Sequence, residues 1–137
     1  AEYTALNWEV YPDGLYHLLN RLYFEYRMPK LIIAENGCSY PDTPDKNGRV
    51  ADPKRIAYLR GHLAAVHRAI QNGVPVAGYL HWSLMDNFEW AEGYSQRFGL
   101  VYVDYDTQER LPKESACWYR AVIAANGFDT EARSAGN

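Results

Sequence analysis

The chain has 137 residues, of which 47% are hydrophobic and 23% charged, and its formal net charge is −3. This composition favours a folded globular domain over global disorder. Acidic and basic residues are interspersed without a basic stripe, and no apolar stretch approaches the ~18 residues that span a bilayer, so we expect neither a nucleic-acid partner nor a membrane.

The first half of the chain predicts a helix followed by a strand. Apolar residues recur at helical spacing between residues 13 and 27, and Met28-Pro29 ends this pattern. The run "KLIIA" at residues 30–34 is continuously apolar from Leu31 to Ala34 rather than alternating, which predicts a strand buried on both faces. A polar loop follows over residues 36–51.

A second helix and a second strand follow this loop. Asp52 predicts an N-cap, Pro53 a first-turn proline, and Asn72-Gly73 a left-handed C-terminal cap. The run "VPVAGYLHWSL" at residues 74–84 then predicts another buried strand. A helix between two strands indicates a right-handed βαβ unit with parallel strands.

The last part predicts a loop or short helix over residues 85–99, and a strand and turn over residues 100–112. A final helix is expected to begin at Pro112 and to stop at Gly127. Two parallel strands cannot close a sheet and leave edges on both sides, so the chain is expected to be part of a larger α/β sheet.

Four side chains are expected at one rim of this sheet, because functional groups gather at the C-terminal ends of parallel strands. Glu35 ends the first strand, Trp82 ends the second, and Glu89-Trp90 follow in the next loop, whereas alternation directs His81 away. Each has an ordinary structural alternative: a solvated or capping Glu35, a core Trp82 and a helix start at Glu89. The excess of aromatic residues, with 12 Tyr, 4 Trp and 4 Phe, fits either a core or a carbohydrate site.

Three sequence motifs together resemble glycoside hydrolase family 1, specifically the C-terminal third of its β-glucosidases. They are "LIIAENG", the long run from "DPKRIAYLRGHL" through "HWSLMDNFEWAEGYSQRFGLVYVDY", and "RLPKESACWY". The resemblance extends from about Trp8 to about Gly127. It implies a partial (β/α)8 TIM barrel of the α/β class, in which residues 1–137 supply about the last two βα units, with strands seven and eight and the terminal helix.

The resemblance also implies a role for each site residue. The acid of "ENG" is the family's nucleophile, which assigns that role to Glu35. The tryptophan of "HWSL" and the pair of "NFEW" hold the terminal sugar, which implies sugar-binding roles for Trp82, Glu89 and Trp90. The phenylalanine of "QRFG" lines the same pocket, which adds Phe98.

These roles imply a retaining β-glucosidase that removes terminal non-reducing β-D-glucosyl residues from β-glucosides or cello-oligosaccharides by double displacement. The sequence departs from the family at Ala34, where threonine is usual, so we expect altered hydrogen bonding beside Glu35. Since a carboxylate at Glu89 would repel a phosphate, an unphosphorylated sugar is expected.

The family's acid/base residue is the glutamate of an "NEP" motif, and this motif is absent from the 137 residues. We therefore expect a fragment that is inactive alone and either self-associates or needs a complementary N-terminal part of the barrel. A sugar-binding module without catalysis and a purely structural half-barrel are the competing hypotheses.

No metal or cofactor is expected, because no zinc spacing, phosphate-binding glycine loop or Ser-His-Asp set is present. Cys38 and Cys117 stand in no metal-binding or CxxC spacing and are expected to be free thiols. This pattern favours a reducing compartment and hence a cytoplasmic location, although any signal peptide would lie on the part expected to precede residue 1.

Overall fold

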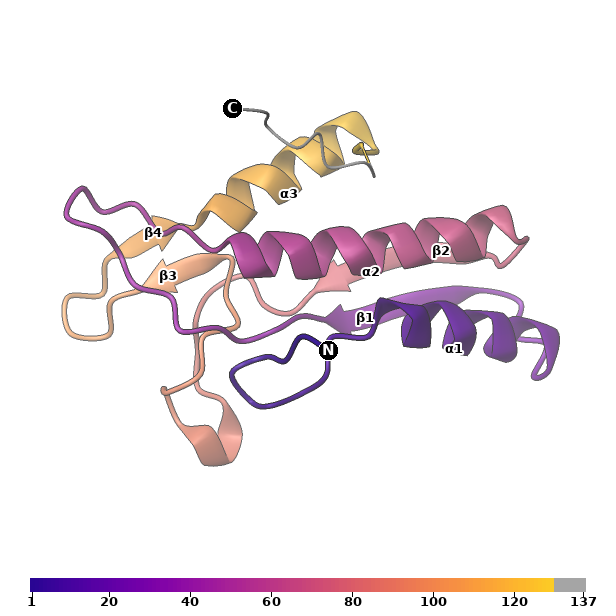
Figure 1. The fold of residues 1–137 in the computed structure, drawn as a ribbon, viewed down its shortest axis with the longest axis horizontal. Helices are drawn as coiled ribbons and strands as arrows, with labels where there is room; N and C mark the ends of the chain where they lie inside the picture. Colours follow the sequence, from indigo (N-terminus) through magenta and orange to yellow (C-terminus); the bar gives the residue numbers. More distant parts are fainter. Residues whose placement is uncertain (130–137) are drawn as a thin grey trace.

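The computed structural model describes residues 1–129. Its elements, in chain order, are α1 (Pro12–Phe24), β1 (Leu31–Asn36), α2 (Pro53–Gln71), β2 (Val76–His81), the 3-10 helix η1 (Trp90–Glu92), β3 (Val101–Val103), β4 (Arg110–Pro112) and α3 (Glu114–Ala125). Figure 1 shows β1, β2, α1 and α2 running roughly along the long axis, with the β3–β4 hairpin and η1 gathered at one end.

The predicted βαβ unit is confirmed, because β1 and β2 pair in parallel and α2 connects them. The pairing is irregular in two places. Leu31 and Ile32 lie opposite Val76 and Gly78, which adds a residue to β2, whereas Ile33 and Asn36 lie opposite Tyr79 and His81, which adds one to β1. The second irregularity is a β-bulge immediately before the end of β1.

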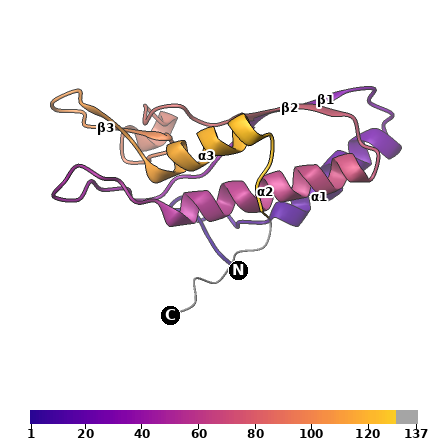
Figure 2. The ribbon, with the colours of Figure 1, turned by 90° about the horizontal axis from the view of Figure 1, so that it is seen from above.

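The helices α1 and α2 lie on the same side of this two-stranded sheet (Figure 2). The apolar core forms between the two layers and consists of Leu19, Ile33, Val66, Ala69 and Val74. The apolar stripes that predict the helices in the sequence are therefore the surfaces that pack on the sheet.

The opposite face of the sheet is exposed. Ile32 on β1 and Leu80 on β2 are 57% and 55% accessible, and the described residues place no helix over them. The expectation that these strands are buried on both faces is therefore wrong for the described part of the chain. It is, however, what a section taken from a larger closed sheet would present.

The helix boundaries differ from the sequence predictions in physical detail. α1 ends at Phe24 rather than near residue 27, and the chain leaves it with Arg27 at φ +56°. Gly73 after α2 has φ +92°, as expected of a glycine that ends a helix. Asp52 precedes α2, but its carboxylate does not cap the helix. It instead binds the buried Arg55, at 2.6 Å, and Ser115.

The C-terminal part contains a strand that the sequence analysis did not separate. β3 and β4 form an antiparallel hairpin, with Val101 opposite Pro112. Pro112 therefore ends a strand, and α3 begins two residues later. At its other end α3 is closed by Asn126 in the left-handed region, one residue before the predicted Gly127.

None of the helices described between residues 1 and 129 is both long and apolar enough to cross a membrane. Cys38 is buried, Cys117 is exposed, and both are free thiols as predicted.

Candidate active site

A cleft of about 470 Å³ lies at the C-terminal ends of β1 and β2. All five residues predicted from the sequence, namely Glu35, Trp82, Glu89, Trp90 and Phe98, line it. Trp8, Asn36, Gly37 and Tyr58 complete the wall. The volume falls within the range of roughly 300–1,000 Å³ that is usual for small-molecule sites.

Glu35 owes its direction to the bulge in β1. In a regular strand, alternation would send Glu35 to the same side as Ile33, which is buried against the helices. The extra residue shifts this alternation, so that Asn36 reaches Tyr58 on α2 while Glu35 is exposed and lines the cleft. The bulge therefore turns the carboxylate out of the helix interface and toward solvent.

Gly37 lets the two strand ends approach each other closely. A Cβ at this position would lie 1.7 Å from the carbonyl oxygen of Trp82, a distance that no side chain can occupy. The Trp82 amide in turn donates a hydrogen bond to the Asn36 carbonyl at 3.0 Å. Trp82 is 37% exposed, so it is not a core residue.

Glu89 and Trp90 stand on a tight turn. The Glu89 amide donates to the Gly93 carbonyl at 2.7 Å, and the Gly93 amide donates to the Trp90 carbonyl at 3.1 Å. Gly93 has φ +59°, a conformation that favours glycine. The indole of Trp90 is 82% exposed and stands free at the edge of the cleft.

Phe98 is the buried counterpart of these exposed rings, with 4% of its surface accessible. Its carbonyl accepts a hydrogen bond from the Ser83 amide at 3.1 Å, which ties it to the residue after Trp82. Its ring lies 6.0 Å from that of Trp8. The cleft thus combines an aromatic wall with two carboxylates, those of Glu35 and Glu89. This composition suits a polyhydroxylated ligand.

The model of the family described as glycosyl hydrolase family 1 matches residues 1–128. The chain belongs to glycosyl hydrolase family 1. The expected family is therefore confirmed.

Curated relatives of this family share about half of their residues with the chain. Beta-glucosidase A of Thermotoga maritima is 51% identical over 126 residues, which cover 92% of this chain and 28% of the relative. A bifunctional beta-D-glucosidase/beta-D-fucosidase of Bifidobacterium breve is 52% identical over 126 residues, covering 89% of this chain and 27% of the relative. The chain thus spans about a quarter of the length of these family 1 relatives.

Solved structures give the same result for the fold. A family 1 β-glucosidase from Thermotoga maritima in complex with isofagomine lactam superposes with a TM-score of 0.92 at 50% identity. The alignment covers 93% of this chain and 29% of that one. The partial α/β barrel expected from the sequence is therefore confirmed.

Four residues of the cleft were missed by the sequence analysis, namely Gly37 and the three discussed next. Asn36 follows Glu35 directly, and its position beside a strand-end acid was a usable signal. Tyr58 comes from α2 and Trp8 from the irregular N-terminal segment. Neither is near Glu35 in the sequence, so no local pattern points to them.

A buried carboxylate, Asp86, holds the loop after β2. This loop carries the sugar-binding candidates Glu89, Trp90 and Phe98. Asp86 accepts hydrogen bonds from Lys113 at 2.9 Å, from Arg97 at 2.6 Å and from the Gly99 amide at 2.9 Å. Since Arg97 and Gly99 flank Phe98, these contacts fix the aromatic wall of the cleft.

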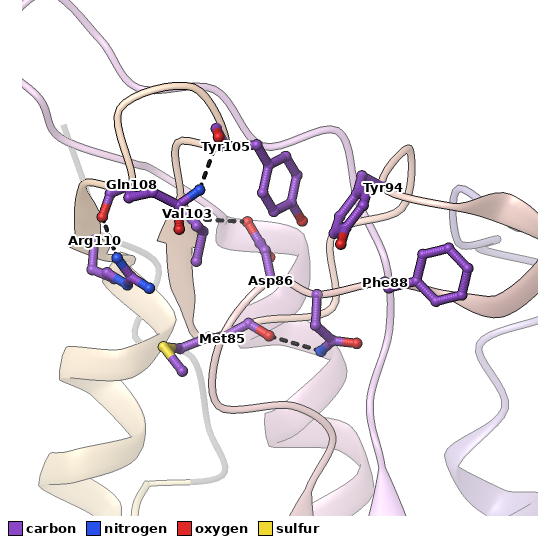
Figure 3. A pocket seen from close by; sticks show the side chains of 9 residues that line it. Met85, Asp86, Phe88, Tyr94, Val103, Tyr105, Gln108 and Arg110 are labelled. Atoms are coloured by element: carbon purple, nitrogen blue, oxygen red, sulfur yellow. Dashed lines mark hydrogen bonds between the residues drawn. The ribbon is translucent and has the colours of Figure 1, made fainter.

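A second cavity of about 440 Å³ lies on the other side of this loop and shares no lining residue with the cleft. Figure 3 shows Asp86 at its centre, bonded toward Val103, with the rings of Tyr94 and Tyr105 beside it. These rings stand 4.7 Å apart. The loop and the β3–β4 hairpin are also joined directly beside the cavity, because the Asp86 amide donates to the Val101 carbonyl at 3.0 Å and the Val101 amide donates to the Leu84 carbonyl at 2.9 Å.

The wider ion network is buried and balanced in charge. Arg55 contacts Asp42 at 2.7 Å and Asp52 at 2.6 Å, and Lys113 contacts Asp42 at 2.6 Å. Burial, with help from the charge of Arg55, lowers the pKa of Lys113, whereas its two carboxylate partners oppose this shift. The network therefore depends on every member being paired.

Proposed function

We propose that this chain supplies the nucleophile and the sugar-binding wall of a retaining β-glucosidase. The observation that carries the proposal is the position of Glu35, an exposed carboxylate that a β-bulge turns into a cleft containing Trp82, Glu89 and Trp90. The names of the relatives, which include β-glucosidases, support the same substrate class.

The chemistry requires two carboxyl groups about 5 Å apart on either side of the scissile bond. In the first step a Glu35 oxygen forms a bond to the anomeric carbon, and the bond from that carbon to the leaving oxygen breaks. The leaving oxygen takes a proton from the second carboxyl group. In the second step water, deprotonated by the same group, displaces Glu35 and restores the original configuration.

The second carboxyl group is proposed to come from a part of the family barrel outside this chain. The Asn-Glu-Pro word that marks it in the family is absent from the 137 residues. The exposed apolar side chains of the inner sheet face, Ile32 and Leu80, are the proposed contact surface for that part. One carboxylate alone cannot both attack and supply the proton.

The sugar ring is proposed to lie against the indoles, with its hydroxyls bound by Glu89. An aromatic face matches the C–H face of a sugar, and a carboxylate accepts charge-assisted hydrogen bonds from hydroxyl groups. The same carboxylate would repel a phosphate on the ring. The proposed substrate is therefore an unphosphorylated β-glucoside, and a glucoside 6-phosphate should be cleaved more slowly.

A substrate that needs no proton gives the sharpest test. In 2,4-dinitrophenyl 2-deoxy-2-fluoro-β-glucoside the phenolate leaves with its electron pair unprotonated, so a nucleophile can be glycosylated without an acid partner. We expect this compound to add one fluoroglucosyl group to Glu35, which peptide mass spectrometry locates. Labelling is measured with the chain alone and with the chain mixed with the part of the Thermotoga maritima relative that lies outside the matching region.

The companion measurement separates catalysis from binding alone. Turnover of an ordinary β-glucoside is expected only in the mixture, and Glu35→Gln should abolish it. Glucose binding that persists in Glu35→Gln, with neither labelling nor turnover in the unmodified chain, would instead support a sugar-binding module and contradict the proposal.

A further inference from the structure

Asn36, the residue after Glu35, is held between two tyrosine hydroxyls from different elements. The Tyr79 hydroxyl of β2 donates to Asn36 Oδ1 at 2.6 Å, and Asn36 Nδ2 donates to the Tyr58 hydroxyl of α2 at 3.1 Å. The Asn36 carbonyl also accepts the Trp82 amide at 3.0 Å. Its side chain and its backbone are therefore both fixed.

The two tyrosines are themselves well anchored. Tyr58 is 9% exposed, and its ring stacks on His62 with the ring centroids 3.9 Å apart. Tyr79 packs against the apolar core. Burial raises the pKa of both hydroxyls, that of Tyr58 to about 12, so both stay protonated at neutral pH.

These contacts act on the residue that decides the direction of Glu35. The bulge lies between Ile33 and Asn36. It allows Ile33 to pack in the core and Asn36 to reach Tyr58 on α2 at the same time. Ile33 is held there by the core, and Asn36 by the two hydroxyls. If Asn36 were released, regular alternation would become available to β1, and it would direct Glu35 toward the helices.

We propose that Asn36 is a positioning residue for Glu35, and that the Tyr79–Asn36–Tyr58 hydrogen-bond chain keeps the bulge that aims the carboxylate into the cleft. This inference rests on the proposed function, because it assigns Asn36 a role in the glycosylation of Glu35. It predicts a defect in the rate of attack rather than in sugar binding, since the Asn36 side-chain amide is already bonded to Tyr58 and Tyr79 and the predicted sugar contacts come from the segment after β2.

The test is the concentration dependence of labelling by 2,4-dinitrophenyl 2-deoxy-2-fluoro-β-glucoside, in the mixture with the remaining part of the relative. We expect Asn36→Ala and Tyr79→Phe to lower the limiting labelling rate about 10- to 100-fold, because small misplacement of a reacting group has effects of this size. The concentration that gives half the limiting rate should stay within about twofold. Tyr23→Phe is the matched control, because Tyr23 packs on the same core and makes no side-chain hydrogen bond among those found in residues 1–129.

The outcomes separate this inference from the proposed function. Absence of labelling in the unmodified chain would overturn the proposed function, and this inference with it. Labelling of the unmodified chain together with normal rates in Asn36→Ala and Tyr79→Phe would overturn the inference alone. If Asn36→Ala loses its near-ultraviolet circular dichroism, Tyr79→Phe decides the matter, because it removes one hydroxyl and leaves the ring packing in place. A rise in the half-saturating concentration at an unchanged limiting rate would likewise contradict a positioning role.

Discussion

The two ends of the sheet are stabilised by different forces. The end that begins β1 and β2 packs on α1 and the last turns of α2 through apolar side chains such as Leu19 and Val66. The end that carries the cleft is held by buried ions, with Asp86, Arg97 and Lys113 at the centre. Apolar burial is non-directional, whereas ion pairs and hydrogen bonds fix side chains at defined distances. The end with the proposed chemistry is thus the one where directional ion pairs and hydrogen bonds fix the positions of the side chains.

The largest effect is expected from Asp86→Ala, which leaves Arg97 and Lys113 without their shared carboxylate. Removing one member of a buried ion pair typically costs about 3–5 kcal/mol, and we expect a loss of unfolding free energy in that range. Urea denaturation measures it. Hydrogen exchange should show faster amide exchange over residues 82–100. Glu25→Ala breaks the exposed pair with Arg21 and is the control, with an expected change within about 0.5 kcal/mol. Equal effects of the two substitutions would remove the distinction between the ends.

A somewhat smaller loss, about 3 kcal/mol, is expected from Gly37→Ala, because its Cβ would displace the Trp82 carbonyl and force the strand ends apart. The labelling rate of Glu35 should fall with it. Gly127→Ala is the matched control, since an added Cβ there meets no atom within 4 Å. A Gly37→Ala protein with unchanged stability would mean that the two strand ends are looser than the structure shows.

The apolar end should respond differently. Leu19→Ala removes a side chain that is 3% exposed, and we expect a loss of about 2.5 kcal/mol from the cavity that remains. Under conditions where the variant stays folded, the limiting labelling rate of Glu35 should be unchanged. Thermal unfolding and labelling kinetics measure the two quantities separately, and a coupled loss of both would contradict the division between the two ends.

Acid should weaken the cleft end through His81. Burial, together with the charges of Arg55 and Lys113, lowers the pKa of His81 to about 4, and the nearby backbone of Phe98 and Asn36 only partly opposes this shift. The unfolded state therefore binds more protons than the folded state between about pH 6.5 and pH 4, so the contribution to stability is complete above this window and is lost as the pH falls through it.

We expect this contribution to be up to about 2 kcal/mol, measured as the pH dependence of urea unfolding. His81→Leu should flatten the dependence between pH 6.5 and pH 4. A smaller slope should remain from His62, whose pKa is also lowered by burial. His17→Gln, at an exposed position on α1, should leave the profile unchanged. An unaltered slope in His81→Leu would show that another group is responsible.

The sequence was sufficient for elements with local signals and insufficient for features that depend on distant contacts. Pro53 and Gly73 mark the ends of α2 through their own backbone preferences, and the strand-end position of Glu35 follows from the apolar run before it. The bulge does not follow, because it depends on Asn36 finding Tyr58 and Tyr79, which lie 22 and 43 residues away.

Asp52 illustrates the same limit. The residue type and its position before a helix predict an N-cap. In the structure the Asp52 carboxylate instead accepts hydrogen bonds from Arg55 and Ser115, which are buried beside it. The exposure of Ile32 is a related case. Its apolar character predicts burial, but 57% of its surface is accessible in the described part of the chain.

The most direct test of the central claim is the anomeric configuration of the product formed when Glu35 is removed. In Glu35→Ala, mixed with the remaining part of the relative, azide should occupy the space left by the carboxylate and attack the anomeric carbon of 2,4-dinitrophenyl β-glucoside from that side, releasing the phenolate. We predict α-glucosyl azide, identified by nuclear magnetic resonance, from Glu35→Ala and none from Glu89→Ala. Formation of the β-azide, or of no azide product in a folded Glu35→Ala protein, would contradict the assignment of Glu35 as the attacking group.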